Sequence, residues 1–203
     1  MRIIAVAVLA LVLGFAISWV LSNNRPIELE AGTWLGEQAR ALPEFELRDH
    51  NNQPLTRESL NGKWNLIFFG YTHCPDICPT SLQALNDMLQ VIDDPDVSNA
   101  LRVYFVSVDP DRDKPEILAS YVNYFNPSFT GATAQMDQLQ PLTRSLGIAH
   151  AIRNRVEGNP VYDVDHSAAI VLVNPKAEFA GLFGAPHDAA VMARDMTRIV
   201  EYN

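Results

Sequence analysis

Cysteine and basic residues are both scarce in this chain of 203 residues. Only two cysteines are present, Cys74 and Cys78, which excludes a scaffold of several disulfides and a zinc or iron-sulfur site built from the cysteines of one chain. The 15 lysines and arginines do not cluster and are outnumbered by 24 acidic residues. A net charge of -9 opposes binding to phosphates, so we expect no nucleic-acid partner. With 48% hydrophobic residues, the chain can bury a substantial core.

The longest apolar stretch lies at the N-terminus. Residues 3–21 carry no charge and would span roughly 28 Å as a helix, which is long enough to cross a bilayer. A cleaved signal peptide is the alternative, but its apolar region is usually only about 7–15 residues long. Arg2 favours a cytoplasmic N-terminus, and no Arg- and Ser-rich leader precedes the stretch. We therefore expect residues 1–21 to be a single-pass anchor in a bacterial inner membrane, with the remaining chain in the periplasm.

Beyond this anchor, the sequence predicts a tether at residues 22–38 and one folded domain at residues 39–203. Apolar runs typical of buried strands alternate with helical spacing, and a hairpin and a last helix follow. Parallel strands joined by right-handed helical crossovers predict an α/β protein with a thioredoxin-like sandwich fold. The expected strands are residues 64–70, 102–108, 168–173 and 179–183, and the expected helices are residues 80–92, 115–125, 134–146 and 189–201.

Both cysteines fall in the loop between the first strong strand and its helix, where open α/β folds place their sites. Pro79 is tolerated in a first helical turn, so Cys78 lies beside unpaired helix amides that favour a thiolate. The short spacing allows both sulfurs to bind one metal ion or to form a disulfide bond. The alternative is that the two cysteines have no chemical role and are either a buried structural pair or an inert disulfide.

The spacing of the cysteines narrows the possible chemistry. Three residues separate Cys74 from Cys78, whereas thioredoxin-type enzymes have two, and Pro79 stands where haem attachment needs a histidine. Monovalent copper is a soft ion that favours thiolates and accepts imidazole. The third ligand should therefore be a histidine that folding brings close to the sulfurs.

His166 is the first candidate for that ligand. It precedes the apolar strand at residues 168–173, and in a thioredoxin-like sandwich this segment passes beside the cysteine loop. The alternative is a histidine that only forms a hydrogen bond with a carbonyl group or with Asp165. We expect the other histidines to lie elsewhere. His50 and His150 should be on the surface, and the side chain of His73 should point away from the cysteines. His187 should lie at the start of the last helix.

The acidic segment at residues 109–113 suggests a calcium loop because its carboxylates alternate. An EF-hand needs Gly at its sixth position and Glu at its twelfth, but this chain has Lys114 and Ser120 there. We interpret the segment as an acidic turn that caps the helix beginning near Pro115, with a docking or supporting role as the alternative.

Three motifs together resemble those of the Sco/SenC family of copper chaperones: FGYTHCPDICP at residues 69–79, VDPDRD at residues 108–113 and DVDHS at residues 163–167. The resemblance covers nearly all of the soluble domain, and an N-terminal membrane anchor is also typical of the family. It implies that Cys74, Cys78 and His166 bind a copper ion. It further implies delivery of copper to the dinuclear copper site of cytochrome c oxidase.

Other positions match the family less informatively. Asp109 and Asp163 correspond to acidic residues of the family motifs, without a clear role. The hairpin has Ala177 where the family often has Gly, which leaves the turn geometry uncertain.

Two functions remain open. The first is a membrane-anchored copper metallochaperone, with the copper-site subunit of cytochrome c oxidase and an upstream copper donor as its partners. The second is an enzyme, a thiol-disulfide oxidoreductase in which Cys74 and Cys78 are redox-active. Its partners would be a thiol reductant and the cysteines of the oxidase or of other extracytoplasmic proteins. Zinc is an alternative ion, since two cysteines and one histidine with an open position also suit it.

Overall fold

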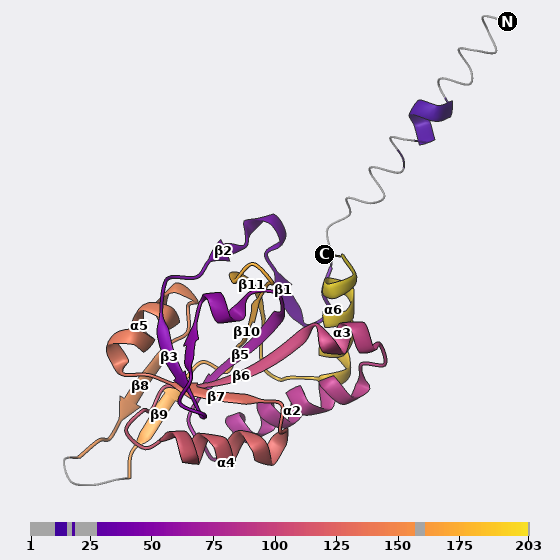
Figure 1. Ribbon diagram of the computed structural model, residues 1–203. Coiled ribbons are helices and arrows are strands. Elements are labelled where there is room, and N and C mark those ends of the chain that lie inside the picture. Colours follow the sequence, from indigo (N-terminus) through magenta and orange to yellow (C-terminus); the bar gives the residue numbers. More distant parts are fainter. Residues whose placement is uncertain (1–10, 16–17, 19–27, 157–160, 203) are drawn as a thin grey trace, which may run out of the picture.

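The computed structural model describes residues 11–15, 18, 28–156 and 161–202 (Figure 1). The predicted anchor at residues 1–21 falls largely outside these ranges, although residues 11–15 are helical. Within the ranges given, no helix is both long enough and apolar enough to span a membrane.

A mixed sheet forms the centre of the described part of the chain, with the strand order β1-β11-β10-β5-β6-β7-β3-β4 and with β2 attached to β11. The central strands β5, β6 and β7 run parallel to one another, whereas β10 pairs antiparallel with both β5 and β11. A separate two-stranded sheet, β8–β9, projects from one end (Figure 1). The strands are β1 (Gly32–Trp34), β2 (Arg40–Ala41), β3 (Glu46–Asp49), β4 (Pro54–Thr56), β5 (Trp64–Gly70), β6 (Leu101–Ser107), β7 (Thr130–Thr133), β8 (His150–Arg153), β9 (Asp163–His166), β10 (Ile170–Val173) and β11 (Glu178–Phe183).

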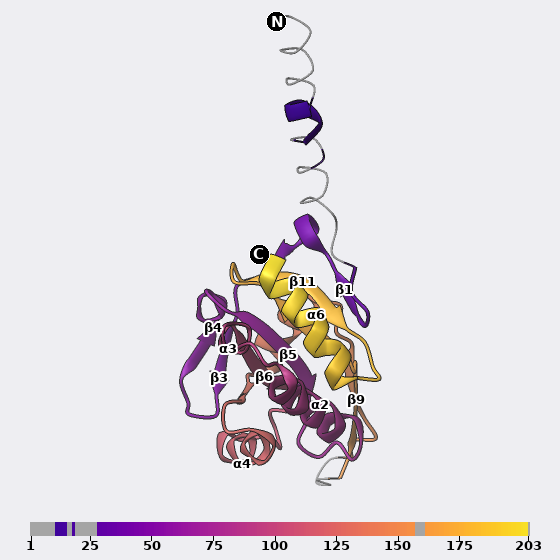
Figure 2. The same cartoon turned by 90° about the vertical axis from the view of Figure 1, so that its right-hand side faces the viewer.

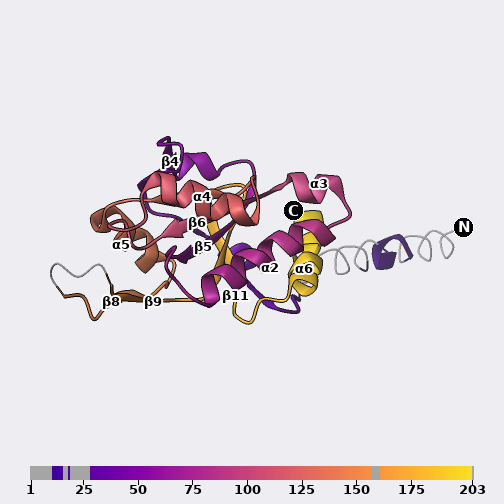
Figure 3. The same ribbon diagram turned by 90° about the horizontal axis from the view of Figure 1, so that it is seen from below.

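Helices cover both faces of this sheet. One face is packed against α2, α4 and α6, of which α2 and α6 contact each other (Figures 2 and 3), and the other is packed against α5. The arrangement is the thioredoxin-like α/β sandwich that the sequence predicts. The helices are η1 (Gly36–Gln38), η2 (Glu58–Leu60), α2 (Ile77–Val91), α3 (Pro95–Asn99), α4 (Pro115–Phe125), α5 (Met136–Ser145) and α6 (Ala189–Tyr202), of which η1 and η2 are 3-10 helices.

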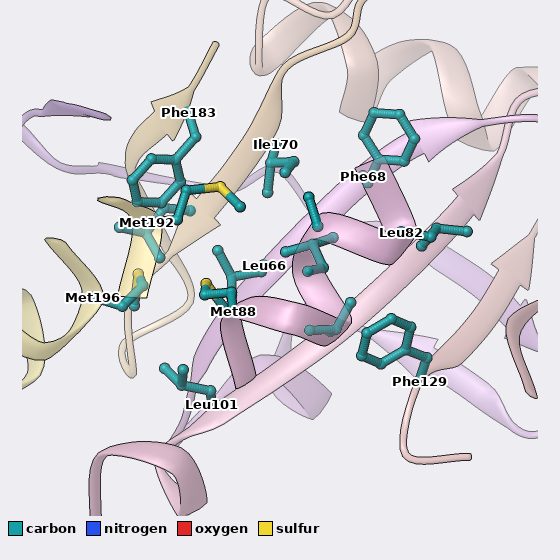
Figure 4. Packing of buried hydrophobic residues seen from close by; sticks show 14 of the residues in the cluster. Leu66, Phe68, Leu82, Met88, Leu101, Phe129, Ile170, Phe183, Met192 and Met196 are labelled. Atoms are coloured by element: carbon teal, nitrogen blue, oxygen red, sulfur yellow. The ribbon is translucent and has the colours of Figure 1, made fainter. Parts of the chain in front are cut away.

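The strand β5 is buried along its whole length because its apolar side chains serve two cores. Leu66 and Phe68 belong to the cluster beneath α2 and α6, together with Leu82 and Met88 of α2 (Figure 4). Ile67 and Phe69 belong to the cluster on the opposite face of the sheet. Each such side chain stabilises the fold by about 1.5–3 kcal/mol when fully buried, so the end of β5 is a rigid support for the loop that follows.

The folded domain begins earlier than residue 39, which corrects the predicted tether. Gly32–Trp34 forms β1 and pairs with β11. Asp195 of α6 is completely buried, and its carboxylate accepts hydrogen bonds from the backbone amides of Glu30, Ala31 and Gly32 at 2.9–3.2 Å. A strand of three residues carries too little periodicity to be recognised in the sequence.

The hairpin between β10 and β11 keeps a tight turn without glycine. Ala177 adopts a left-handed conformation with φ of 56°, and its amide donates a hydrogen bond to the carbonyl group of Asn174 at 2.9 Å. The departure from the usual Gly therefore leaves the turn intact, at the cost of some backbone strain.

The last residue of β5, Gly70, lies against the first turn of α2. A Cβ atom at this position would be 2.5 Å from Cys78 Sγ and 2.9 Å from the Phe105 ring. The absence of a side chain therefore allows the strand to approach the second cysteine closely.

We expect Gly70→Ala to lower the free energy of unfolding by about 1–3 kcal/mol, because the new methyl group must displace Cys78 or Phe105. The measurement is urea unfolding, with Gly184→Ala as the matched control, since a Cβ at Gly184 meets no atom within 4 Å. Equal unfolding midpoints for the two variants would contradict this account of the strand end.

Candidate metal centre

The two cysteines occupy different environments at the junction of β5 and α2. Cys74 lies in the loop before the helix and is partly exposed, whereas Cys78 lies in the first helical turn and is completely buried. Neither cysteine forms a disulfide bond. The expected helix start at residue 80 is too late by one turn, so Cys78 is held by helical backbone as well as by the contact with Gly70.

The third donor comes from a segment 88 residues after Cys78 in the chain. His166 is the last residue of β9, and its Nε2 atom lies 3.3 Å from Cys78 Sγ. Its Nδ1 atom lies 3.0 Å from the carbonyl oxygen of Ser167 and donates a hydrogen bond to it. This hydrogen bond fixes the proton on Nδ1 and leaves Nε2 as the nitrogen that can bind a metal ion.

Three potential ligand atoms therefore converge on one point. The sulfurs of Cys74 and Cys78 and one ring nitrogen of His166 all lie within 4.8 Å of one another. An ion bonded to sulfur at about 2.3 Å and to nitrogen at about 2.0 Å needs donor atoms no further apart than about 4.6 Å. The residue set predicted from the sequence fits a single soft metal ion with only small side-chain adjustments.

Hydrogen bonding between the sulfurs makes the two thiols unequal. The hydrogen bond from Cys78 lowers the pKa of Cys74 to about 3, with a further contribution from His166 and against the opposing effect of burial. The hydrogen bond to Cys74 and burial raise the pKa of Cys78. Burial opposes protonation of His166, but its hydrogen bond with Cys74 raises the pKa of the imidazole overall. At neutral pH the pair therefore consists of a thiolate at Cys74 and a thiol at Cys78.

Aromatic rings surround the imidazole of His166. The ring of Phe68 meets it edge-on at a centroid distance of 5.9 Å, and the ring of Tyr71 does so at 5.7 Å. These rings limit the access of water and restrict rotation of the imidazole, so Nε2 stays directed towards the sulfurs.

A buried carboxylate fixes the cysteine loop. Asp113 accepts hydrogen bonds from the backbone amide and hydroxyl group of Thr72 at 2.9 and 2.6 Å, and from the hydroxyl group of Ser107 at 2.5 Å. The predicted role of this acidic segment as a helix cap is wrong, because α4 has Lys114 at its N-cap and no side-chain capping hydrogen bond there. The contact between residues 72 and 113 is a tertiary one, which sequence spacing alone did not reveal.

A second buried carboxylate, Asp109, ties the loop at residues 108–113 to the hairpin that carries His166. Asp109 accepts hydrogen bonds from the Tyr162 hydroxyl group at 2.6 Å and from Arg112 Nε. The Arg112 guanidinium lies 3.6 Å from the centre of the Tyr162 ring and donates a hydrogen bond to the Tyr162 carbonyl oxygen at 3.0 Å. Tyr162 directly precedes β9, so this network positions the strand that ends at His166. Asp163, the other acidic match to the family, is exposed.

The remaining histidines lie outside this group of three donors. His73 is 54% exposed, and its Nδ1 forms a hydrogen bond with the Thr72 hydroxyl group. His187 precedes α6, as predicted, and its Nδ1 lies 3.0 Å from Ser81 Oγ. The surface location predicted for His50 and His150 is wrong, since both are partly buried: His50 follows β3 and accepts a hydrogen bond from the Gly131 amide, and His150 pairs with His166.

We expect the reduced, metal-free protein to show one thiolate per chain by ultraviolet absorbance at neutral pH. A thiol is ionised above its pKa, so this signal should persist as the pH falls and disappear only near pH 3, the lowered value for Cys74. Cys74→Ala should remove the signal at neutral pH, and Cys78→Ser should keep it but shift its titration to higher pH. A signal that titrates near pH 8.5, the approximate value for an unperturbed cysteine, would contradict the assignment.

Comparison with known proteins agrees with this geometry. The family model described as SCO1/SenC matches residues 35–201. A protein of Stutzerimonas stutzeri is 35% identical, and the aligned region covers 85% of this chain and 83% of that protein. Mitochondrial protein SCO2 of Saccharomyces cerevisiae is also 35% identical over 79% of this chain, which spans 53% of the yeast protein.

A solved structure shares the fold of the domain. The structure of Bradyrhizobium japonicum ScoI with copper bound superimposes with a TM-score of 0.68 and 32% sequence identity, over 78% of this chain and 98% of that one. The family match spans the cysteine loop, the loop after β6 and the strand that ends at His166. This chain therefore belongs to the SCO1/SenC family.

Proposed function

We propose that this protein is a copper metallochaperone, which binds one copper ion through Cys74, Cys78 and His166 and delivers it to the dinuclear copper site of cytochrome c oxidase. The observation that carries the proposal is the convergence of two sulfurs and one imidazole nitrogen within 4.8 Å. The copper-bound structure of the related B. japonicum ScoI supports the choice of ion. The family resemblance supports the choice of recipient.

The donor set suits an ion that must be held and then released. Thiolates favour monovalent copper, and three protein donors leave one side of the ion open. Cys74 is partly exposed at the edge of the site, so ligands of a partner protein can approach from that side. Copper then moves by ligand exchange, and no bond within a substrate is broken.

We also propose that residues 1–21 anchor the protein in a bacterial inner membrane and that its domain works in the periplasm. The uncharged stretch at residues 3–21 supports the anchor, and the preceding Arg2 supports the orientation. The partners would then be the copper-site subunit of cytochrome c oxidase and a periplasmic copper donor or thiol reductant.

We expect the reduced protein to retain about one copper ion per chain after gel filtration and to show thiolate-to-copper charge transfer in its absorption spectrum. The double variant Cys74→Ala, Cys78→Ala should lose both properties, and His166→Ala should weaken binding. His73→Ala is the matched control, because this histidine is adjacent to Cys74 in sequence but lies outside the donor group. Copper retention by the double variant at the wild-type level would refute the proposal, and displacement of copper by equimolar zinc would assign the site to zinc.

Thiol-disulfide exchange is a second candidate function, favoured by the unequal thiols. Cys74 combines a lowered pKa with partial exposure, as in an attacking thiol, and Cys78 is buried beside it. Cys74 would attack a partner disulfide and release one partner thiolate. Cys78 would then give its proton to the released partner thiolate, attack the mixed disulfide and release the second partner thiolate, which leaves this chain oxidised and the partner reduced by two electrons.

We expect this second candidate, if correct, to give a trapped mixed disulfide between Cys78→Ser and a fluorescent peptide that contains a disulfide. Cys74→Ser is the matched control and should trap nothing, because Cys78 is buried. Mass spectrometry under non-reducing conditions detects the adduct. Absence of an adduct with Cys78→Ser would exclude the exchange function, whereas full activity of His166→Ala in cells that require both cysteines would favour it over copper transfer.

A further inference from the structure

The hairpin that positions His166 brings a second imidazole next to it. In the antiparallel pair β8–β9, His150 is directly opposite His166. The Ser167 amide donates a hydrogen bond to the Ala149 carbonyl group at 2.9 Å, which makes the adjacent pair, His150 and His166, a non-hydrogen-bonded one. Side chains approach each other most closely in pairs of this kind, with Cβ atoms about 4.5–5.5 Å apart.

Both imidazoles lie on the inner face of this hairpin. Along β8, His150 and Ile152 are partly buried while Ala151 and Arg153 are exposed. Along β9, the same alternation makes Val164 buried and His166 partly buried. Residues directly opposite each other in a ladder share a face, so His150 lies on the face from which His166 contacts Cys78.

One nitrogen of His150 is available for a ligand. Its Nδ1 atom is buried and has no hydrogen-bond partner among the residues that the structure describes. Burial and the facing imidazole of His166 lower the pKa of His150, against the opposing effect of a hydrogen bond with the Ile148 backbone. The buried Nδ1 atom without a partner carries a desolvation cost that a metal bond would offset.

We propose that His150 is a fourth copper ligand, which joins Cys74, Cys78 and His166 when the bound ion is divalent. This inference rests on the proposed copper function and extends it to the oxidation state of the ion. Monovalent copper is satisfied by the three donors already within 4.8 Å of one another. Divalent copper prefers a four-coordinate tetragonal site with nitrogen donors, and His150 is the imidazole placed beside that set by strand pairing.

His187 offers a matched control for His150. It is also partly buried, has a pKa lowered by burial, and has a buried nitrogen, Nε2, without a hydrogen-bond partner in the described residues. It differs in position, because it follows β11 and its Nδ1 forms a hydrogen bond with Ser81 Oγ. Its ring makes a T-shaped contact with the Phe68 ring at a centroid distance of 6.3 Å. A general effect of removing a buried imidazole should appear in both variants, whereas an effect through ligation should appear only at His150.

The test is electron paramagnetic resonance of the full chain loaded with divalent copper. Hyperfine coupling should show two coordinated imidazole nitrogens in the wild type and in His187→Gln, but only one in His150→Gln. Chelator competition should show that His150→Gln weakens binding of divalent copper by at least about tenfold, while affinity for monovalent copper changes by less than about threefold. A single coordinated imidazole in the wild type would refute the inference without any variant, so the inference stays testable even if His150→Gln folds poorly.

Two results would overturn the inference: a single coordinated imidazole in the wild type, or the same spectrum and affinity in His150→Gln as in the wild type. Either result leaves copper binding by Cys74, Cys78 and His166 intact. Failure of the copper function itself would appear separately, as undiminished copper retention in the double cysteine variant.

Discussion

The contact between the Cys78 sulfur and the His166 imidazole joins two segments that are 88 residues apart in the chain. Both residues are held by regular backbone, since Cys78 lies in the first turn of α2 and His166 ends β9. The absence of a side chain at Gly70 lets the Cys78 sulfur pack directly against the end of β5, and the hydrogen bond to the Ser167 carbonyl group orients the imidazole. Cys74, on the loop, is the donor with the most freedom to move, which suits a site that exchanges what it holds.

The loop at residues 108–113 braces both halves of this centre. Asp113 binds the segment that leads to Cys74, and Asp109 binds Tyr162 at the start of β9. Burying two carboxylates costs desolvation free energy, which is offset here because each accepts several hydrogen bonds. Asp113 accepts them from Thr72 and Ser107, and Asp109 accepts them from Tyr162 and Arg112. Both donor segments are thus ordered before an ion arrives, which reduces the entropy lost on binding.

The parts of the fold that could be predicted from sequence are those with long apolar patterns. β5, β6 and α6 begin and end within about one residue of the expected positions, because each buries several large side chains. β8 and β9 were not predicted, since each has only two inward residues, and the surface location expected for His150 failed for the same reason. Cys74, Cys78 and His166 were predictable as a set from loop position and motif resemblance. The role of Asp113 was not, because it depends on contacts across 41 residues.

The Asp195 carboxylate has a consequence for how the protein could work at a surface. It fastens Glu30, Ala31 and Gly32 to α6, and the C-terminal end of α6 lies at the opposite end of the domain from the β8–β9 hairpin (Figure 1). If residues 1–21 anchor the chain, as proposed, the eight residues from 22 to 29 can separate this clamped segment from the membrane by at most about 26–29 Å. The β8–β9 end of the domain, which carries His166, would then point away from the membrane, so this short segment and the length of the domain together limit how far from the membrane a recipient can receive copper.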